Sequence, residues 1–272
     1  MKFITTMILA GTDPEAEWTY ISVGGFMRHC PGDLLLVDNT PQPGNPTIQR
    51  LAAMDRVTVI RNPATETGWN GMKSHGSGYD AAFQWCRENG YDQMVSLEAD
   101  TRVESGVWHQ ALRDAVSEGY YMAGMSRLAD GIEHHTLACY DVHAAWPSFK
   151  VACIADERDH AAFLELIDWK TRKQQVTGLI GGNVMWDTFS SKVFDTGQKA
   201  WFWAASQGKV KHLVLERIEG LEGGGQHQWG GIGRRPVPDL LAKWIEGREY
   251  GAELLRAFQP RRTDKEVHRY HQ

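Results

Sequence analysis

Short apolar runs that stop at a polar residue recur along the first hundred residues of the chain. Short apolar runs that contain β-branched residues are a local signal of strands, and here they predict four of them, at residues 2–11, 34–40, 56–62 and 94–101. The segments between these runs are longer and more polar. The pattern therefore predicts strands that alternate with helices.

Apolar residues at helical spacing support the predicted helices. The first set, with Ser77 as the predicted N-cap and Gly90 just past the end, comprises Tyr79, Ala82, Phe83 and Cys86. The second, opened by Ser105 and closed by Gly119, comprises Trp108, Ala111, Leu112 and Ala115. A further helix is predicted at 157–170, after a charged start. This alternation indicates an α/β fold with a largely parallel sheet, whose ligands bind beyond the carboxyl ends of the strands.

Carboxylates stand at the ends of two predicted strands. The run MVSLEADT carries Glu98 and Asp100, and residues i and i+2 of an extended strand point the same way. The run LLLVDNT stops at Asp38. Carboxylate oxygens suit Mg²⁺ or Mn²⁺, which bind through one or two such groups and leave other positions to water and phosphates. The pattern predicts a metal and nucleotide-diphosphate site, with acidic ends of ordinary surface strands as the alternative.

These motifs resemble those of the GT-A-fold glycosyltransferases, most nearly the family 2 type. The resemblance implies a GT-A-like (Rossmann-like) catalytic domain over residues 1–235, with a mixed, mostly parallel sheet flanked by helices. It also implies that Asp38 and Asn39 contact the donor nucleotide. By the same resemblance, Glu98 and Asp100 bind the diphosphate and a Mn²⁺ or Mg²⁺ ion, although Glu98 departs from the Asp usual in the family.

Two later segments extend the resemblance. GLIGGNVMW at 178–186 is similar to the family's Gly-Gly segment beside the acceptor, which implies acceptor contacts at Gly181 and Gly182. FDTGQKAWFWAASQGKVKHL at 194–213 is similar to its acid-led helix followed by a Gly and a strand. In inverting relatives that acid is the catalytic base, which implies this role for Asp195. Helix capping by Asp195 is the alternative.

Glycine-rich segments complete the predicted site. GWNGMKSHGSG at 68–78 follows the third strand, and the resemblance implies that Lys73 touches the donor phosphate; a plain loop is the alternative. GGGQHQWGGIGRR at 223–235 is predicted to be a lid that brings His227 to the metal and Trp229 to the acceptor. For His227 the alternative is an ordinary surface histidine.

Composition agrees with an ordinary folded domain. The chain has 272 residues, of which 42% are hydrophobic and 23% charged, and its 11 Trp residues supply aromatic faces for the core or for stacking on sugars and bases. Four cysteines without paired spacing predict free thiols and a reducing compartment: Cys30, Cys86, Cys139 and Cys153. No apolar run reaches the ~18–20 residues that span a bilayer, so we expect a cytoplasmic protein.

Residues 236–272 are predicted to form a basic helical tail. From 234 onward nine Lys and Arg stand against six acids, so this part carries +3 and the rest −8 of the net charge of −5. Its apolar positions fit an amphipathic helix that ends before Pro260. Two readings stay open, a helix packed on the domain and a helix that binds an anionic partner such as nucleic acid.

The predicted function is that of a hexosyltransferase-type glycosyltransferase with a nucleotide-sugar donor, a UDP-sugar being the expected one. A nucleotidyltransferase or pyrophosphorylase is one alternative, although Gly11, Thr12, Asp13 and Pro14 stand where that class has a Gly-rich basic signature. The other is a non-catalytic sugar- or nucleic-acid-binding module. Saccharides, small metabolites, proteins and hydroxylated DNA bases all stay open as acceptors.

Overall fold

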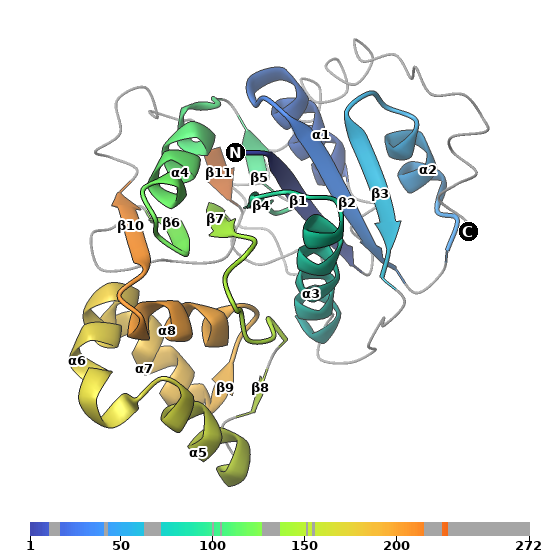
Figure 1. Ribbon diagram of the computed structural model, residues 1–272. Coiled ribbons are helices and arrows are strands. Elements are labelled where there is room, and N and C mark those ends of the chain that lie inside the picture. Colours follow the sequence, from blue (N-terminus) through green and yellow to red (C-terminus); the bar gives the residue numbers. More distant parts are fainter. Residues whose placement is uncertain are drawn as a thin grey trace, which may run out of the picture.

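A seven-stranded sheet of order β10-β6-β7-β4-β1-β2-β3 lies at the centre of the molecule (Figure 1). The computed structural model describes residues 1–10, 17–40, 43–62, 72–99, 101–103, 105–126, 137–150, 152–153, 156–214 and 225–227. The strands of this sheet are β1 (Phe3–Ala10), β2 (Asp33–Asn39), β3 (Val57–Arg61), β4 (Gln93–Leu97), β6 (Met122–Ser126), β7 (Leu137–Asp141) and β10 (Val210–Val214). Strand β7 runs antiparallel to both neighbours, and the other pairings are parallel. The predicted mixed, mostly parallel sheet is confirmed.

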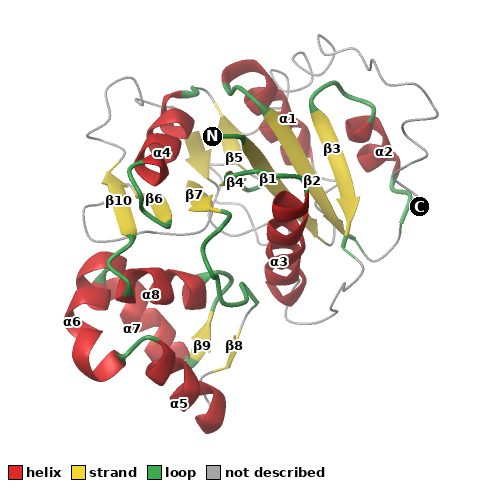
Figure 2. Ribbon diagram, in the orientation of Figure 1, coloured by secondary structure: helices red, strands yellow, loops and turns green. Residues whose placement is uncertain are grey.

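Helices cover both faces of the sheet (Figure 2). Alternate strand residues pack against α1 (Glu17–His29), α2 (Pro46–Ala52) and α4 (Val107–Ser117) on one face. The opposite residues pack against α3 (Met72–Glu88) and against the helices of residues 157–206, here called the helical module. Because side chains alternate along a strand, each buried strand contributes residues to the apolar cores on both faces of the sheet. This explains why the strands read as nearly continuous apolar runs.

The fourth predicted strand ends earlier than its sequence indicates. Strand β4 stops at Leu97, and Thr101 N donates a hydrogen bond to Glu98 O at 3.1 Å, which turns the chain. Residues Thr101–Val103 then form the short strand β5. The prediction that an extended strand continues through Glu98 is therefore wrong, and with it the argument that strand geometry places Glu98 and the acid two residues later on one face. A turn, and not a strand, holds Glu98.

Helix α3 begins at Met72, five residues before its predicted N-cap. Ser77 lies inside the helix, where its hydroxyl is buried and accepts a hydrogen bond from Asn62 Nδ2 at 2.9 Å. The next residue, Gly78, lets the helix approach the sheet, since a Cβ there would lie 2.7 Å from both Asn39 Nδ2 and Ile8 Cγ2. Helix α4 follows its prediction: Val107 N donates to Ser105 Oγ at 3.2 Å, and Gly119 has φ 96°.

The helical module contains α5 (Glu157–Leu166), α6 (Trp169–Ile180), α7 (Gly182–Ser191) and α8 (Gln198–Ser206), with the two-stranded sheet of β8 (Ala152–Cys153) and β9 (Val193–Phe194). The single helix predicted at 157–170 is wrong, because Asp168 adopts φ 48° and separates α5 from α6. Asp156 caps α5 by accepting from Arg158 N at 3.1 Å and Asp159 N at 3.3 Å. Helix α8 followed by a glycine and β10 matches the prediction for 194–213.

Three cysteines, Cys30, Cys86 and Cys139, are buried free thiols, as predicted. Burial raises the pKa of Cys30 and of Cys86 to about 12, so these thiols stay protonated. The Cys153 side chain and the predicted tail at 236–272 lie outside the described residues. No helix in the described ranges combines the length and apolarity needed to cross a membrane.

Acid should weaken the fold through His109. Its ring is fully buried and shares a 2.8 Å hydrogen bond between Nε2 and Thr5 Oγ1. Burial, with a smaller contribution from the charge of Arg113, lowers the pKa of His109 to about 3. Between that value and the unfolded value near 6.5, only the unfolded chain takes up a proton, so stability is complete above this window and falls as pH drops through it.

We expect the free energy of unfolding to be about 2 kcal/mol lower at pH 5 than at pH 7 from this residue alone. Urea denaturation of the wild type and of His109→Gln at both pH values measures the effect. The variant is less stable at neutral pH but should lose that share of the acid dependence. An equal acid dependence in both proteins would contradict the assignment to His109.

Candidate active site

The carboxyl ends of the parallel strands β1 to β4 meet at one edge of the sheet, and the predicted donor-site residues gather there. Asp38 and Asn39 end β2, and Glu98 follows β4. The register pairs Asp38 with Leu9 of β1 and with Arg61, the last residue of β3. In α/β folds this is the edge at which ligands bind. Asp38, Asn39 and Glu98 thus lie at the carboxyl edge of the sheet, and their roles there stay predictions.

Asp38 is fully buried and holds a network of hydrogen bonds. Its Oδ1 accepts from Thr40 N at 2.9 Å and Thr40 Oγ1 at 2.6 Å, and its Oδ2 pairs with Arg61 Nη1 at 2.8 Å. Arg61 Nη2 also donates to Thr40 O at 2.5 Å, while 26% of the Arg61 side chain remains exposed. Of this ion pair, Arg61 is therefore the member that reaches solvent. Sequence reasoning missed it, although its place at the end of the third strand was the available signal.

Helix α1 supports the turn that carries Glu98. The Ser22 hydroxyl donates to Thr101 O and lies 3.3 Å from Glu98 O. One turn later Gly25 meets β5 so closely that a Cβ there would lie 2.5 Å from Val103 O. The Glu98 side chain is half-buried. Asp100, the second acid of the motif, lies outside the described residues.

The glycine-rich segment near the end of the described chain returns to this turn. Strand β11 (Gly225–His227) pairs antiparallel with β5, and His227 stands opposite Thr101. The backbone of His227 therefore lies beside the residue that follows Asp100, as expected for a segment that completes the site. The side chain of His227 and the whole of Trp229 lie outside the described residues, so their roles stay predictions.

Asp195 lies half-buried between β9 and α8, and it does not cap the helix. Its Oδ1 accepts from Thr196 N at 2.6 Å, whereas the N-cap of α8 is Gly197, with φ 77° and no side-chain cap. Gln198 Oε1 accepts from Asp195 N at 2.8 Å and from Thr188 Oγ1 at 2.8 Å, which ties the segment to α7. The capping alternative is therefore wrong. Catalytic use of Asp195 stays a prediction.

The predicted Gly-Gly segment is the joint between two helices of the module. Gly181, with φ 95° and ψ 144°, ends α6, and Gly182 begins α7. A side chain at Gly181 would be strained because only glycine adopts this conformation readily. Lys73 belongs to the first turn of α3, which follows β3 at the same sheet edge; its side chain lies outside the described part of the chain.

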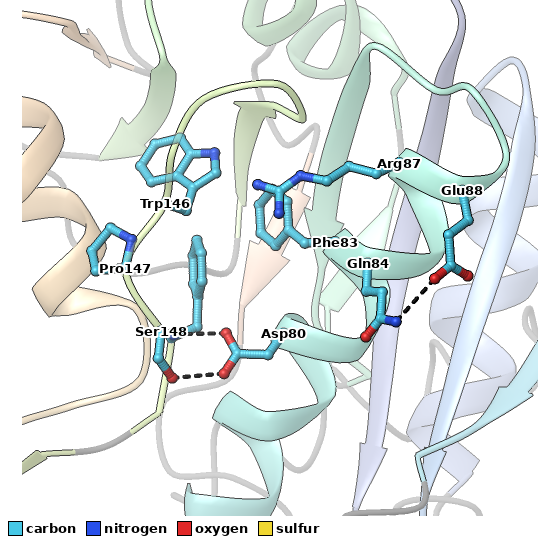
Figure 3. A pocket seen from close by; sticks show the side chains of 9 residues that line it. Asp80, Phe83, Gln84, Arg87, Glu88, Trp146, Pro147 and Ser148 are labelled. Atoms are coloured by element: carbon cyan, nitrogen blue, oxygen red, sulfur yellow. Dashed lines mark hydrogen bonds between the residues drawn. The ribbon is translucent and has the colours of Figure 1, made fainter.

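A hollow of about 530 Å³ lies elsewhere, between α3 and the segment 146–149, and none of the predicted site residues lines it (Figure 3). Asp80 accepts from Ser148 Oγ at 2.6 Å and from Phe149 N at 2.8 Å. Arg87 donates to Val142 O and Ala144 O, both at 2.9 Å. These charged groups hold the segment that leads from the sheet to the helical module, so their observed role is structural.

No family model and no curated protein sequence matches this chain. Among solved structures, the glycosyltransferase GlyE of Streptococcus pneumoniae TIGR4 is similar, with a TM-score of 0.53 at 10% identity over 97% of this chain and 66% of that chain. The WbbM bifunctional glycosyltransferase gives 0.48 at 9% identity over 94% and 51%. The galactosyltransferase LgtC, in complex with donor and acceptor sugar analogs, gives 0.44 at 10% identity over 96% and 98%.

The similarity to GlyE, of which this chain covers just under two thirds, identifies the fold as GT-A-like. At this identity it describes the fold alone, and activity has to be argued from the residues of the site.

Proposed function

We propose that this protein is a glycosyltransferase that moves a sugar from a nucleoside-diphosphate sugar, a UDP-sugar in the simplest case, to an acceptor hydroxyl with inversion. The observation that supports it best is the pairing of β11 with β5. It brings His227 opposite Thr101, immediately after the Glu98 and Asp100 motif and at the carboxyl edge of a GT-A-like sheet. Residues more than a hundred positions apart thereby converge where ligands bind in such sheets.

The side chains proposed as metal ligands, those of Glu98, Asp100 and His227, are of types that bind Mn²⁺ or Mg²⁺. The half-buried Glu98 carboxylate sits on a turn braced by Thr101 N and Ser22, and Asp100 and His227 would add oxygen and nitrogen ligands. Within the described ranges no three His, Cys, Asp or Glu side chains form a cluster, and Asp100 and the His227 side chain fall outside those ranges. A bound divalent ion supplies Lewis-acid stabilisation of the negative charge on the diphosphate.

Recognition of the donor nucleotide is assigned to Arg61 acting with Asp38. The buried Asp38 carboxylate and Thr40 hold the guanidinium at the sheet edge, and the exposed part of Arg61 can donate to the base, ribose or phosphate. Asp38 then contributes to donor binding through Arg61 as well as through any direct contact. Asn39, which is 3% exposed, follows Asp38 and packs against α3 at Gly78.

Removing either member of this pair should weaken donor binding by about 1–3 kcal/mol, because an interacting buried or charged group loses its partner. Asp38→Ala and Arg61→Ala, each compared with the wild type by calorimetric titration of a nucleoside diphosphate in Mn²⁺, measure the effect. Arg50→Ala is the matched control, since Arg50 is an arginine at the surface that contacts the Tyr20 hydroxyl. If folded Asp38→Ala and Arg61→Ala bind the nucleotide normally, this edge is not the nucleotide site.

The transfer itself needs a base on the acceptor side. As the acceptor hydroxyl forms its bond to the anomeric carbon, the bond to the diphosphate breaks and the hydroxyl proton goes to the Asp195 carboxylate. The backbone of Asp195 is held by Gln198, and its carboxylate makes a single hydrogen bond, to Thr196 N, within the described structure. Gly181 and Gly182, at the joint of α6 and α7, form the proposed acceptor border.

Thermal shift with a panel of sugar nucleotides, each with and without Mn²⁺, tests the function first, because a ligand that binds only the folded state raises the apparent stability. We expect a rise in Tm for one nucleotide sugar that depends on Mn²⁺. A rise only with nucleoside triphosphates and sugar phosphates would favour a nucleotidyltransferase. A rise only with saccharides or nucleic acid would favour a binding module.

A further inference from the structure

A buried hydrogen bond joins helix α8 to strand β7, the neighbour of β4 in the sheet. Trp201 Nε1 on α8 donates to the Tyr140 hydroxyl at 3.1 Å, and these side chains are 1% and 0% exposed. Tyr140 lies on β7, which pairs antiparallel with β4, with Leu97 opposite Leu137. Glu98 follows Leu97 directly. The bond thus links the helix that follows Asp195 to the strand beside the one that ends at the acidic turn.

The direction of this hydrogen bond is determined by the groups themselves. An indole N–H can only donate, so the Tyr140 oxygen accepts from Trp201. Ser96 Oγ lies 3.2 Å from both Ala138 O and Ala138 N, so it can donate to one and accept from the other, and it ties β4 to β7 one residue before β4 ends. These contacts favour one arrangement of α8, β7 and β4.

Two buried tyrosine hydroxyls in this core have raised pKa values. Burial raises the pKa of Tyr140 well above its ordinary range, and the negative charge of Glu98 adds to the rise, while the hydrogen bond from Trp201 opposes it. Tyr79 on α3 shows the same pattern, with burial as the main cause and Glu98 among the contributing charges. Both hydroxyls therefore stay protonated at physiological pH.

The amino-terminal end of α8 is held by contacts of Gly197 with Phe149 and with the Trp201 ring. Gly197 N donates to Phe149 O at 3.0 Å, and a Cβ on Gly197 would lie 3.3 Å from Trp201 Nε1. Asp195 precedes Gly197 by two residues and is tied to Gln198 of the same helix. A displacement of the Trp201 ring would therefore move the backbone next to Asp195.

We propose that Trp201 and Tyr140 are positioning residues whose hydrogen bond sets the place of Asp195 relative to the acidic turn at Glu98. The proposal rests on the glycosyltransferase function proposed above. Transfer to the acceptor requires the helical module and the sheet in one relative position, whereas donor binding at the sheet edge does not use α8. Breaking the bond should thus reduce turnover and leave donor affinity intact.

The test uses Tyr140→Phe, Trp201→Phe and the double variant, in the full-length chain. Each single variant should lower kcat for transfer by about 10–100-fold, because misplacement of a reacting group by a fraction of an ångström to 1 Å has effects of this order. Affinity for the nucleoside diphosphate in Mn²⁺ should stay within about twofold. The double variant should be no worse than the poorer single variant, because either change alone removes the bond.

Amide hydrogen exchange gives a readout that does not depend on activity. Exchange at Gly197 should accelerate in Tyr140→Phe, which keeps the ring and so the packing, while exchange in β1 stays as in the wild type. Trp203→Phe is the matched control on the same helix, since the Trp203 ring stacks on Tyr121 with centroids 5.6 Å apart and takes no part in the Trp201–Tyr140 bond. This control should change neither quantity.

Folded Tyr140→Phe with normal kcat would overturn the proposal, as would equal losses in donor affinity and kcat, which indicate general damage. If the wild type turns over no sugar nucleotide, the proposed function fails by itself. Exchange at Gly197 then still decides whether the Trp201–Tyr140 bond positions α8. Faster exchange in both single variants supports this positioning role, and unchanged exchange overturns it.

Discussion

Asp195→Asn is expected to lower kcat by ~10²–10⁴-fold while leaving donor affinity nearly unchanged, because a general base acts on the acceptor proton in the transition state and not on the bound donor. The substitution keeps the size of the side chain and an oxygen able to accept from Thr196 N, so the local backbone should hold. Steady-state kinetics with separate titration of donor and acceptor measures the split between kcat and the two KM values.

Asp168→Asn is the matched control for this prediction. Asp168 lies in the same helical module, is about half exposed, and forms an i,i+4 ion pair with Arg172 at 3.6 Å, so its loss should have little effect on turnover. The anomeric configuration of the product gives an independent check, because direct displacement with a single base inverts it. Near-normal turnover of Asp195→Asn, or retention of configuration, would mean that Asp195 is not the base of an inverting transfer and only accepts a hydrogen bond from Thr196 N.

Asp100→Asn is expected to lower the affinity for a nucleoside diphosphate in Mn²⁺ by at least about 10-fold, since even changes in outer-shell groups reduce metal affinity by ~10–100-fold. The amide keeps the size of the side chain and removes the charge that attracts the ion. Titration with and without Mn²⁺ separates the metal-dependent part of the affinity from the rest, which should not change.

Asp33→Asn is the control for Asp100, because Asp33 is an exposed acid at the opposite, amino-terminal end of β2. It alters the net charge by the same amount without touching the carboxyl edge. Equal loss of affinity in both variants would indicate a general electrostatic effect, and unchanged Mn²⁺-dependent binding in Asp100→Asn would remove this residue from the metal site.

The elements that could be predicted are those whose signal is local. Strands β1 to β3 and the core faces of α3 and α4 follow directly from apolar periodicity, because burial on a helix or strand repeats at the period of its side chains. The errors lie where one residue changes the path of the chain. Asp168, with its left-handed backbone, splits the predicted helix at 157–170, and the turn after Leu97 shortens a predicted strand.

The site shows the same division between local and distant signals. The places of Asp38 and Glu98 at strand ends could be read from the chain, and so could the helix that follows Asp195. The pairing of β11 with β5 involves three residues on each strand and uses backbone groups, which leave no pattern in the sequence. The Asp38–Arg61 pair and the Trp201–Tyr140 bond likewise join residues 23 and 61 positions apart, through contacts that only the tertiary structure brings about.

Release of nucleoside diphosphate from a sugar nucleotide is the most direct test of a metal-assisted transferase. The wild type, without acceptor, should hydrolyse one donor slowly in Mn²⁺, and both chelation of the metal and Asp100→Asn should suppress that release. Release of the same diphosphate at an unchanged rate without metal would contradict the metal site. Release from no sugar nucleotide, together with pyrophosphate formation from a nucleoside triphosphate and a sugar phosphate, would contradict the transferase itself.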